Sequence, residues 1–251
     1  MAYDPELDLL YFGVGNGSPW NRAYRSPGPD GRGEGDNLYL SSIVAIRPDT
    51  GEYVWHYQTT PGETWDYTAT QHIVLADMEI DGRSRQVLMQ APKNGYFYVL
   101  DRTNGKLVSA SKFVMQTTWA DGINLKTGRP NYIEAGRPGA PTTEKGKPVF
   151  ASPSFLGGKN WMPMAYSQDT GLFYVPANHW KEDYWTEEVE YQPGSAYLGM
   201  GFRIKRLFDD HVGILRAMDP ATGKVAWEHK EPMPLWAGVL ATKGNLVFTG
   251  T

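Results

Sequence analysis

Five side chains in glycine- and proline-rich segments are of types that could do chemistry. They are Asn16, Asp66, Lys93, Asn160 and Trp236, and aromatic residues lie close to each of them in the chain. An amide oxygen and a carboxylate are hard oxygen ligands of the kind that Ca²⁺ prefers. A carboxylate between two aromatic residues can act as a general base, and a lysine ammonium can polarise a carbonyl group. These residue types together suit a cation site at which protons are transferred.

Each of these residues also has a purely structural interpretation. Asn16 and Asn160 can form turns, Asp66 can cap a turn, Lys93 can be a solvated surface residue and Trp236 can pack in a core. The spacing of the residues does not decide between the two interpretations, so both stay open at this point.

The sequence argues against several other kinds of site. The segment 13–17, GVGNG, is similar to a dinucleotide-binding loop, but Ser18, Pro19 and Trp20 follow where a helix should begin. There is no cysteine, and the five histidines show no His-x-x-x-His spacing, which argues against zinc. The net charge of −4 argues against a basic nucleic-acid binder. The sequence contains no run of 18 or more apolar residues, which argues against a transmembrane helix.

A short turn sequence recurs four times and indicates the elements that position these residues. The segments 45–55 and 217–227 read AIRPDTGEYVW and AMDPATGKVAW, and weaker copies occupy 100–108 and 166–174. The turn glycines are Gly51, Gly105, Gly171 and Gly223. Each copy is typical of a hairpin, because glycine adopts a positive φ and the Asp or Thr side chain bonds the turn backbone. These glycines are 54, 66 and 52 residues apart, and repeats of this length that contain several strands predict the blades of a β-propeller.

Aromatic and β-branched runs predict short strands, and no long stretch has the period of a helix. We expect strands over 9–13, 42–46, 53–58, 86–90, 95–101, 173–176, 213–218 and 245–250. The fold class is therefore all-β, a partial β-propeller of about four to five blades. Residues 1–251 are expected to form one incomplete propeller domain, an internal piece of a larger ring. A single β-sandwich and a closed four-bladed ring are the alternatives.

Long segments between the predicted strands are expected to be loops that line a binding face. They are 15–37, 59–70, 125–150 and 177–203. The last is aromatic and acidic, and it could form the wall of an apolar pocket for small primary alcohols or simply pack on the surface.

Six segments resemble the quinoprotein alcohol dehydrogenases, which use pyrroloquinoline quinone (PQQ). They are 13–21, 35–39, 64–67, 91–102, 157–161 and 235–238, which read GVGNGSPWN, GDNLY, TWDY, APKNGYFYVLDR, GGKNW and LWAG. The resemblance covers essentially the whole chain. Members of this family are eight-bladed propellers more than twice as long, in which a repeated tryptophan packs onto the neighbouring blade. The resemblance thus implies that the chain supplies four to five of eight blades.

Position by position, the resemblance implies a role for each candidate residue. Asn16 matches the amide ligand of the family's catalytic calcium, and Asp66 matches the aspartate that acts as base beside this calcium. Lys93 matches a cation that hydrogen-bonds the quinone oxygens, and Asn160 and Trp236 match contacts to PQQ. The implied reaction is alcohol oxidation to an aldehyde. Asp66 would take the hydroxyl proton while a hydride passes to PQQ, with calcium as Lewis acid.

The resemblance also bears on the choice of metal. Relatives that use a lanthanide carry a second aspartate two residues after the base, which adds negative charge for a trivalent ion. This chain has Thr68 at that position. Charge matching therefore favours Ca²⁺.

Partners and location are implied by the resemblance as well. A small alcohol would be the substrate, a cytochrome c or ubiquinone would accept the electrons, and the protein would be periplasmic, with a signal peptide upstream of this chain. The isolated chain is expected to be inactive. The alternative is a non-enzymatic propeller of the same repeat class, acting as a scaffold or assembly module.

Overall fold

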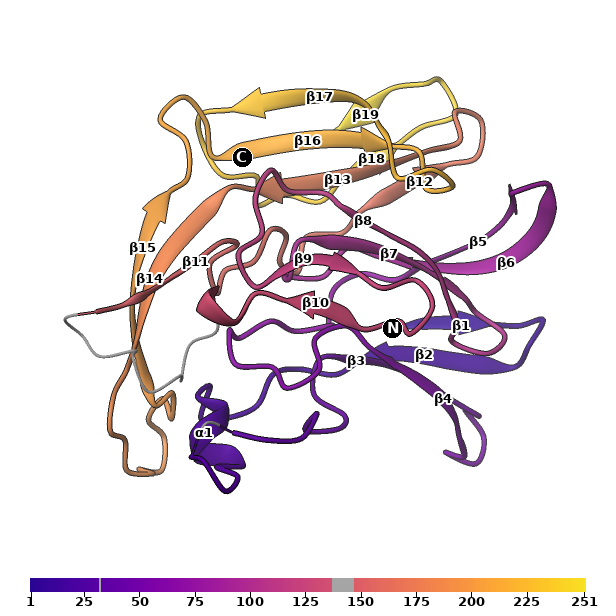
Figure 1. The fold of residues 1–251 in the computed structure, drawn as a ribbon. Coiled ribbons are helices and arrows are strands. Elements are labelled where there is room, and N and C mark those ends of the chain that lie inside the picture. Colours follow the sequence, from indigo (N-terminus) through magenta and orange to yellow (C-terminus); the bar gives the residue numbers. More distant parts are fainter. Residues whose placement is uncertain (32, 137–146) are drawn as a thin grey trace.

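The computed structural model describes residues 1–31, 33–136 and 147–251. Within these ranges the chain forms three four-stranded antiparallel sheets that stack as propeller blades (Figure 1). The first blade contains β1 (Ala2–Asp4), β2 (Leu9–Gly13), β3 (Ser42–Ile46) and β4 (Tyr53–Gln58). The second contains β5 (Val74–Ile80), β6 (Arg83–Gln90), β7 (Tyr96–Asp101) and β8 (Leu107–Lys112). The third contains β12 (Ala165–Ser167), β13 (Leu172–Asn178), β16 (Gly213–Met218) and β17 (Val225–Glu231).

Shorter elements complete the described fold. Two-stranded sheets are formed by β18 (Leu240–Ala241) with β19 (Val247–Phe248), next to the third blade, and by β9 (Ala120–Ile123) with β10 (Pro130–Tyr132). A three-stranded sheet consists of β11 (Val149–Ala151), β14 (Trp180–Thr186) and β15 (Met200–Arg206). The helices are α1 (Arg22–Arg25) and the 3₁₀ turn η1 (Glu134–Gly136). The all-β partial propeller is confirmed, and no helix in the described ranges is long and apolar enough to cross a membrane.

The two ends of the blades carry different kinds of connection. Because neighbouring strands are antiparallel, the turns between the first and second strands and between the third and fourth lie at one end. This turn end holds the repeat glycines at positions 51, 105, 171 and 223, whose φ angles are 73°, 73°, 66° and 70°. The connections between the second and third strands, and from one blade to the next, lie at the opposite end, which we call the loop end. In Figure 1 the β5–β6 hairpin points right, whereas α1 and the β14–β15 hairpin lie at the left.

The core lies between consecutive blades, because both faces of the inner sheets are covered. Alternate residues of β7 point to opposite faces, so Tyr98 packs in the core shared with the first blade and Phe97 in the core shared with the third. Trp55 of β4 contacts the turn of the next blade, where a Cβ on Gly105 would lie 2.5 Å from the indole ring. This contact matches the tryptophan docking that the resemblance implies.

The structure corrects the prediction for 177–203. Residues 180–186 and 200–203 belong to the long β14–β15 hairpin, paired from Trp180↔Arg206 to Thr186↔Met200, whereas residues 187–199 between the two strands are a loop as expected. The run WKEDYWT of β14 is rich in residues that favour strands, and MGFRIKR of β15 pairs with it in continuous register. Within the predicted loop 125–150, the flanks form β10, η1 and part of β11, while 137–146 lie outside the described residues, as does position 32 of loop 15–37.

Candidate functional site at the loop end

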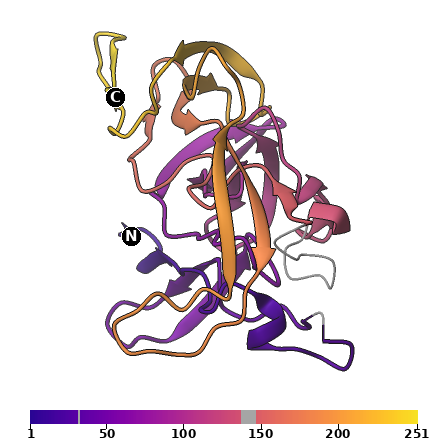
Figure 2. The same cartoon turned by 90° about the vertical axis from the view of Figure 1, so that its left-hand side faces the viewer.

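All five candidate residues lie in loop-end connections. Asn16 follows β2, Asp66 lies between β4 and β5, and Lys93 lies between β6 and β7. Asn160 precedes β12, and Trp236 lies between β17 and β18. The loop end faces the viewer in Figure 2, where the β14–β15 hairpin crosses in front of the blades. Because five separate connections contribute, only the propeller topology can bring these residues to one end of the molecule.

Asp66 and Lys93 form a buried ion pair. The Lys93 Nζ donates to Asp66 Oδ2 at 2.8 Å and to the backbone oxygen of Asp66 at 3.0 Å. Asp66 is 8% exposed and Lys93 is 7% exposed. Burial raises the pKa of Asp66, and the charge of Lys93 and its hydrogen bond oppose this rise. Asp66 also adopts a φ of 64°, in the left-handed region that Asp and Asn tolerate best after glycine.

Ser41 brings the neighbours of Asn16 and Asp66 together. Its backbone N–H donates to Gly15 O at 2.8 Å, and its hydroxyl donates to Tyr67 O. The Asn16 side chain donates from Nδ2 to Gly17 O at 3.1 Å, which leaves its amide oxygen for another partner. These two hydrogen bonds of Ser41 thus hold the Asn16 and Asp66 segments next to each other.

The loop that carries Asn160 packs directly on Lys93. The Gly158 N–H donates to Lys93 O at 2.8 Å. Gly157 has a φ of 84°, and a Cβ there would lie 2.5 Å from Lys93 Cγ, so glycine allows this approach. Asn160 itself is half-buried and binds its own loop, since Nδ2 donates to Leu156 O at 3.0 Å and Oδ1 accepts from the next N–H at 2.9 Å.

The loop of Trp236 is connected to the same row through Asn178. The Asn178 N–H donates to Gly158 O at 2.7 Å, while its side chain bonds both backbone groups of Leu235. Trp236 is half-buried. The structure therefore joins the loops of Asp66, Lys93, Asn160 and Trp236 by successive hydrogen bonds, with the Asn16 loop attached through Ser41.

Residues 1–113 match the family model described as "PQQ: Glucose/ethanol/alcohol dehydrogenase, beta-propeller domain". A quinoprotein ethanol dehydrogenase of Pseudomonas putida is 59% identical over 100% of the chain and 41% of its own length. The chain therefore matches the quinoprotein alcohol dehydrogenases.

Solved structures of alcohol dehydrogenases agree with this match. A europium-containing methanol dehydrogenase superposes with a TM-score of 0.90 at 37% identity, over 100% of this chain and 42% of that one. A quinohemoprotein alcohol dehydrogenase from Comamonas testosteroni superposes with a TM-score of 0.88 at 42% identity, over 100% and 37%. The chain spans about 40% of the length of these relatives.

The prediction from sequence missed a buried carboxylate that shapes the candidate site. Glu63 accepts hydrogen bonds on Oε1 from the N–H groups of Trp65 at 2.6 Å and Tyr67 at 2.8 Å, which flank Asp66. It is fully buried, and burial raises its pKa to about 7, against the effect of the Arg25 charge. The signal was its position in the turn just before TWDY, where a carboxylate can bind N–H groups two and four residues ahead.

A second missed carboxylate, Glu182, comes from the β14–β15 hairpin. It is fully buried, and Oε1 accepts from the N–H of Phe155. Burial raises its pKa to about 8; the Asp66 charge adds to this rise and Lys93 opposes it, so Glu182 lies within electrostatic reach of the ion pair. The Oε2 atoms of both Glu182 and Glu63 are buried without a hydrogen-bond partner among the described residues. No local sequence signal identifies Glu182, because its burial depends on the hairpin.

Lys159, in the GGKNW segment, is a third buried charge-bearing residue near the site. Its Nζ donates to Asn160 O at 2.9 Å and Met162 O at 3.0 Å. Burial lowers its pKa to about 7. The side chain thereby fixes the backbone that presents Asn160.

The donors present suit only part of a calcium shell. Ca²⁺ takes six to eight oxygen ligands. Among the described residues, no three His, Cys, Asp or Glu side chains gather to hold a metal ion. The Asn16 amide and the Asp66 carboxylate have the right chemistry for two positions. Thr68, 9% exposed, is a neutral neighbour whose Oγ1 accepts from Gln71 at 2.8 Å.

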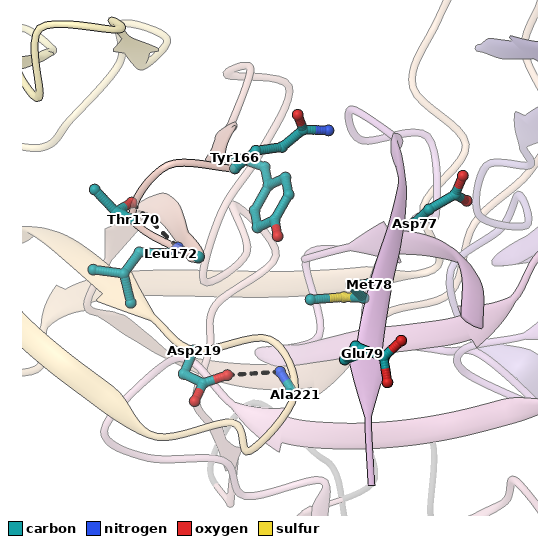
Figure 3. A pocket seen from close by; sticks show the side chains of 10 residues that line it. Asp77, Met78, Glu79, Tyr166, Thr170, Leu172, Asp219 and Ala221 are labelled. Atoms are coloured by element: carbon teal, nitrogen blue, oxygen red, sulfur yellow. Dashed lines mark hydrogen bonds between the residues drawn. The ribbon is translucent and has the colours of Figure 1, made fainter. Parts of the chain in front are cut away.

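A separate groove of about 580 Å³ lies at the turn end between the second and third blades. In Figure 3, Met78 points towards Tyr166, whereas Asp77 and Glu79 leave β5 on its other side. Asp219 is occupied in its turn, where it accepts from the Ala221 N–H at 2.8 Å. The carboxylates therefore do not converge in this groove, and the loop end remains the candidate site.

Proposed function

We propose that this chain is part of a PQQ-dependent dehydrogenase that oxidises small primary alcohols to aldehydes. The observation that carries the proposal is the buried Asp66–Lys93 pair at the loop end, with the Asn16 segment attached through Ser41. A scaffold has no need to bury an ion pair there, because burying charges is unfavourable unless they are compensated.

The residues present fit the proposed groups. When bound, PQQ would accept a hydride from the alcohol carbon, and Ca²⁺ would supply Lewis acidity. Asn16 Oδ1 and the Asp66 carboxylate would hold the metal together with oxygens from outside this set. The Lys93 ammonium has three N–H donors. Two of them donate to Asp66, and the third would donate to a quinone oxygen.

Asp66 would take the hydroxyl proton of the alcohol. Burial raises its pKa towards that of an effective base, and Lys93 keeps the carboxylate charged before the proton arrives. Oδ2 is bound to Lys93, so Oδ1 is the oxygen left for the substrate or metal. Asn160 and Trp236 would contact PQQ from the two following loops.

Calcium, location and electron acceptor are further parts of the proposal. The neutral Thr68 supports Ca²⁺ because a trivalent ion favours an additional carboxylate. A periplasmic location and transfer of electrons to a cytochrome c or ubiquinone rest on the family resemblance. Cell fractionation and reduction of each acceptor in turn would check them.

The proposal is tested with Asp66→Asn in the full-length protein. Asn tolerates the positive φ of this position, so the backbone should be retained. We expect wild-type protein to bind PQQ in a Ca²⁺-dependent manner, seen as quinone absorbance, and the variant to lose alcohol oxidation by at least 100-fold while PQQ stays bound. The control is Asp219→Asn, which removes a turn carboxylate at the opposite end. Near-normal turnover of Asp66→Asn would refute the role of Asp66, and an absence of Ca²⁺-dependent PQQ binding would refute the proposed function.

A further inference from the structure

Asn178, at the end of β13, makes three hydrogen bonds to two different loops. Its backbone N–H donates to Gly158 O at 2.7 Å. Its side-chain Nδ2 donates to Leu235 O at 3.0 Å, and its Oδ1 accepts from Leu235 N–H at 2.8 Å. The residue is 2% exposed. Buried polar groups whose hydrogen bonds are all satisfied rigidify the structure around them.

Only an asparagine-sized amide can make this pair of side-chain bonds. The backbone of Leu235 presents one donor and one acceptor, and a primary amide offers the complementary acceptor and donor. An aspartate would place a carboxylate oxygen against Leu235 O, and leucine would leave both backbone groups unpaired. The pairing is thus sensitive to the loss of a single nitrogen.

Gly213 makes room for this pairing. It lies opposite Asn178 in the β13–β16 register, and its N–H donates to Met233 O at 3.1 Å. A Cβ on Gly213 would lie 2.5 Å from Met233 O and 3.1 Å from Leu235 N. The absent side chain lets the 233–235 segment lie against the end of the blade, within reach of Asn178.

The two loops that Asn178 joins are the ones that carry the last two predicted cofactor contacts. Gly158 belongs to the segment of Asn160 and also donates to Lys93 O at 2.8 Å. Leu235 directly precedes Trp236. We infer that Asn178 is a positioning residue of the PQQ site, which sets the spacing between the Asn160 loop and the Trp236 loop. This inference rests on the proposed function.

The test compares Asn178→Asp and Asn178→Ala with wild type in the full-length protein. The first keeps the shape and the acceptor but replaces the donor, and the second removes the whole amide without adding charge. In metal sites, loss of the partners that orient the ligating side chains typically costs 10- to 100-fold in affinity, and we take the same scale for a loop that orients a PQQ contact. We expect the Kd for PQQ to rise at least 10-fold in both variants, and amide hydrogen exchange across 234–238 to accelerate.

The matched control is Asp4→Asn, which disrupts a buried ion pair at the turn end, where Asp4 Oδ2 accepts from Arg102 Nε at 2.6 Å. We expect it to lower stability but to leave the Kd for PQQ within twofold of wild type, since general destabilisation of a folded protein does not change ligand affinity. Wild-type affinity for PQQ in a folded Asn178→Ala variant would overturn the inference. Failure of wild type itself to bind PQQ would instead refute the proposed function, while unchanged exchange at 234–238 would refute the bridge.

Discussion

Replacing Glu182 by Gln should change how the stability of the protein depends on pH. Burial raises the pKa of Glu182 to about 8 from an ordinary value of 4.5. Between these two pH values the folded protein keeps the proton that the unfolded chain releases. By linkage, the free energy of unfolding of wild type must therefore fall as the pH rises from about 4.5 to about 8. Gln cannot ionise, so the variant should lack this part of the pH dependence.

The size of the effect follows from the same shift. Each pKa unit corresponds to about 1.4 kcal/mol, so ionised Glu182 costs the fold on the order of 5 kcal/mol above pH 8. Gln keeps an oxygen for the Phe155 N–H. The variant should match wild type near pH 4.5 and exceed its unfolding free energy by several kcal/mol at pH 8.5.

Urea denaturation of both proteins at half-unit steps from pH 4.5 to 8.5 measures this difference. Glu188→Gln, on an exposed position of the same hairpin segment, is the control and should track wild type at every pH. Burial also raises the pKa of Glu63 to about 7, so Glu63 makes the free energy of unfolding fall with rising pH as well. This contribution is the same in wild type and in Glu182→Gln. A constant difference between Glu182→Gln and wild type across this range would refute the argument that the buried Glu182 carboxyl keeps its proton in the folded protein.

Two other substitutions test the packing that positions the site. Gly157→Ala would place a Cβ 2.5 Å from Lys93 Cγ at a φ of 84°. We therefore expect the variant to lose about 1–3 kcal/mol of stability and to bind PQQ more weakly than wild type. Equal PQQ affinity in titrations of the two proteins would show that Lys93 accommodates the methyl group. Trp55→Ala should cost about 3–5 kcal/mol in urea unfolding, because the indole fills the space above Gly105 between two blades; a loss below 1 kcal/mol would contradict this packing.

The parts of the fold that the sequence predicted are those with local signals. The turn at Gly51 needs only a glycine and its neighbouring Asp and Thr, and strand β3 (Ser42–Ile46) needs only a run of apolar residues. By contrast, the β14–β15 hairpin depends on pairing across a connection rich in polar residues. Its aromatic first strand is predicted from the sequence as a loop, because the run WKEDYWT does not alternate strictly between apolar and polar residues.

The candidate site was predicted through the family resemblance rather than through residue types alone. Asp66 and Lys93 are 27 residues apart, and nothing local indicates that they meet; the Lys93–Asp66 contact results from the stacking of two blades. Glu182 escaped prediction for the same reason, since a carboxylate in a strand ordinarily faces solvent. The assignments of Asn16, Asp66 and the other site residues remain predictions for the experiments above.

The hydrogen bonds that join the loop-end segments use backbone atoms at most of their ends, including Gly15 O, Tyr67 O, Lys93 O and Gly158 N and O. Backbone groups are the same whatever side chain a residue carries. Side chains on the rim of this end can therefore be exchanged during evolution with little effect on the framework beneath them. Such an architecture allows the surface of this end to diversify while the spacing of the segments beneath it is inherited unchanged.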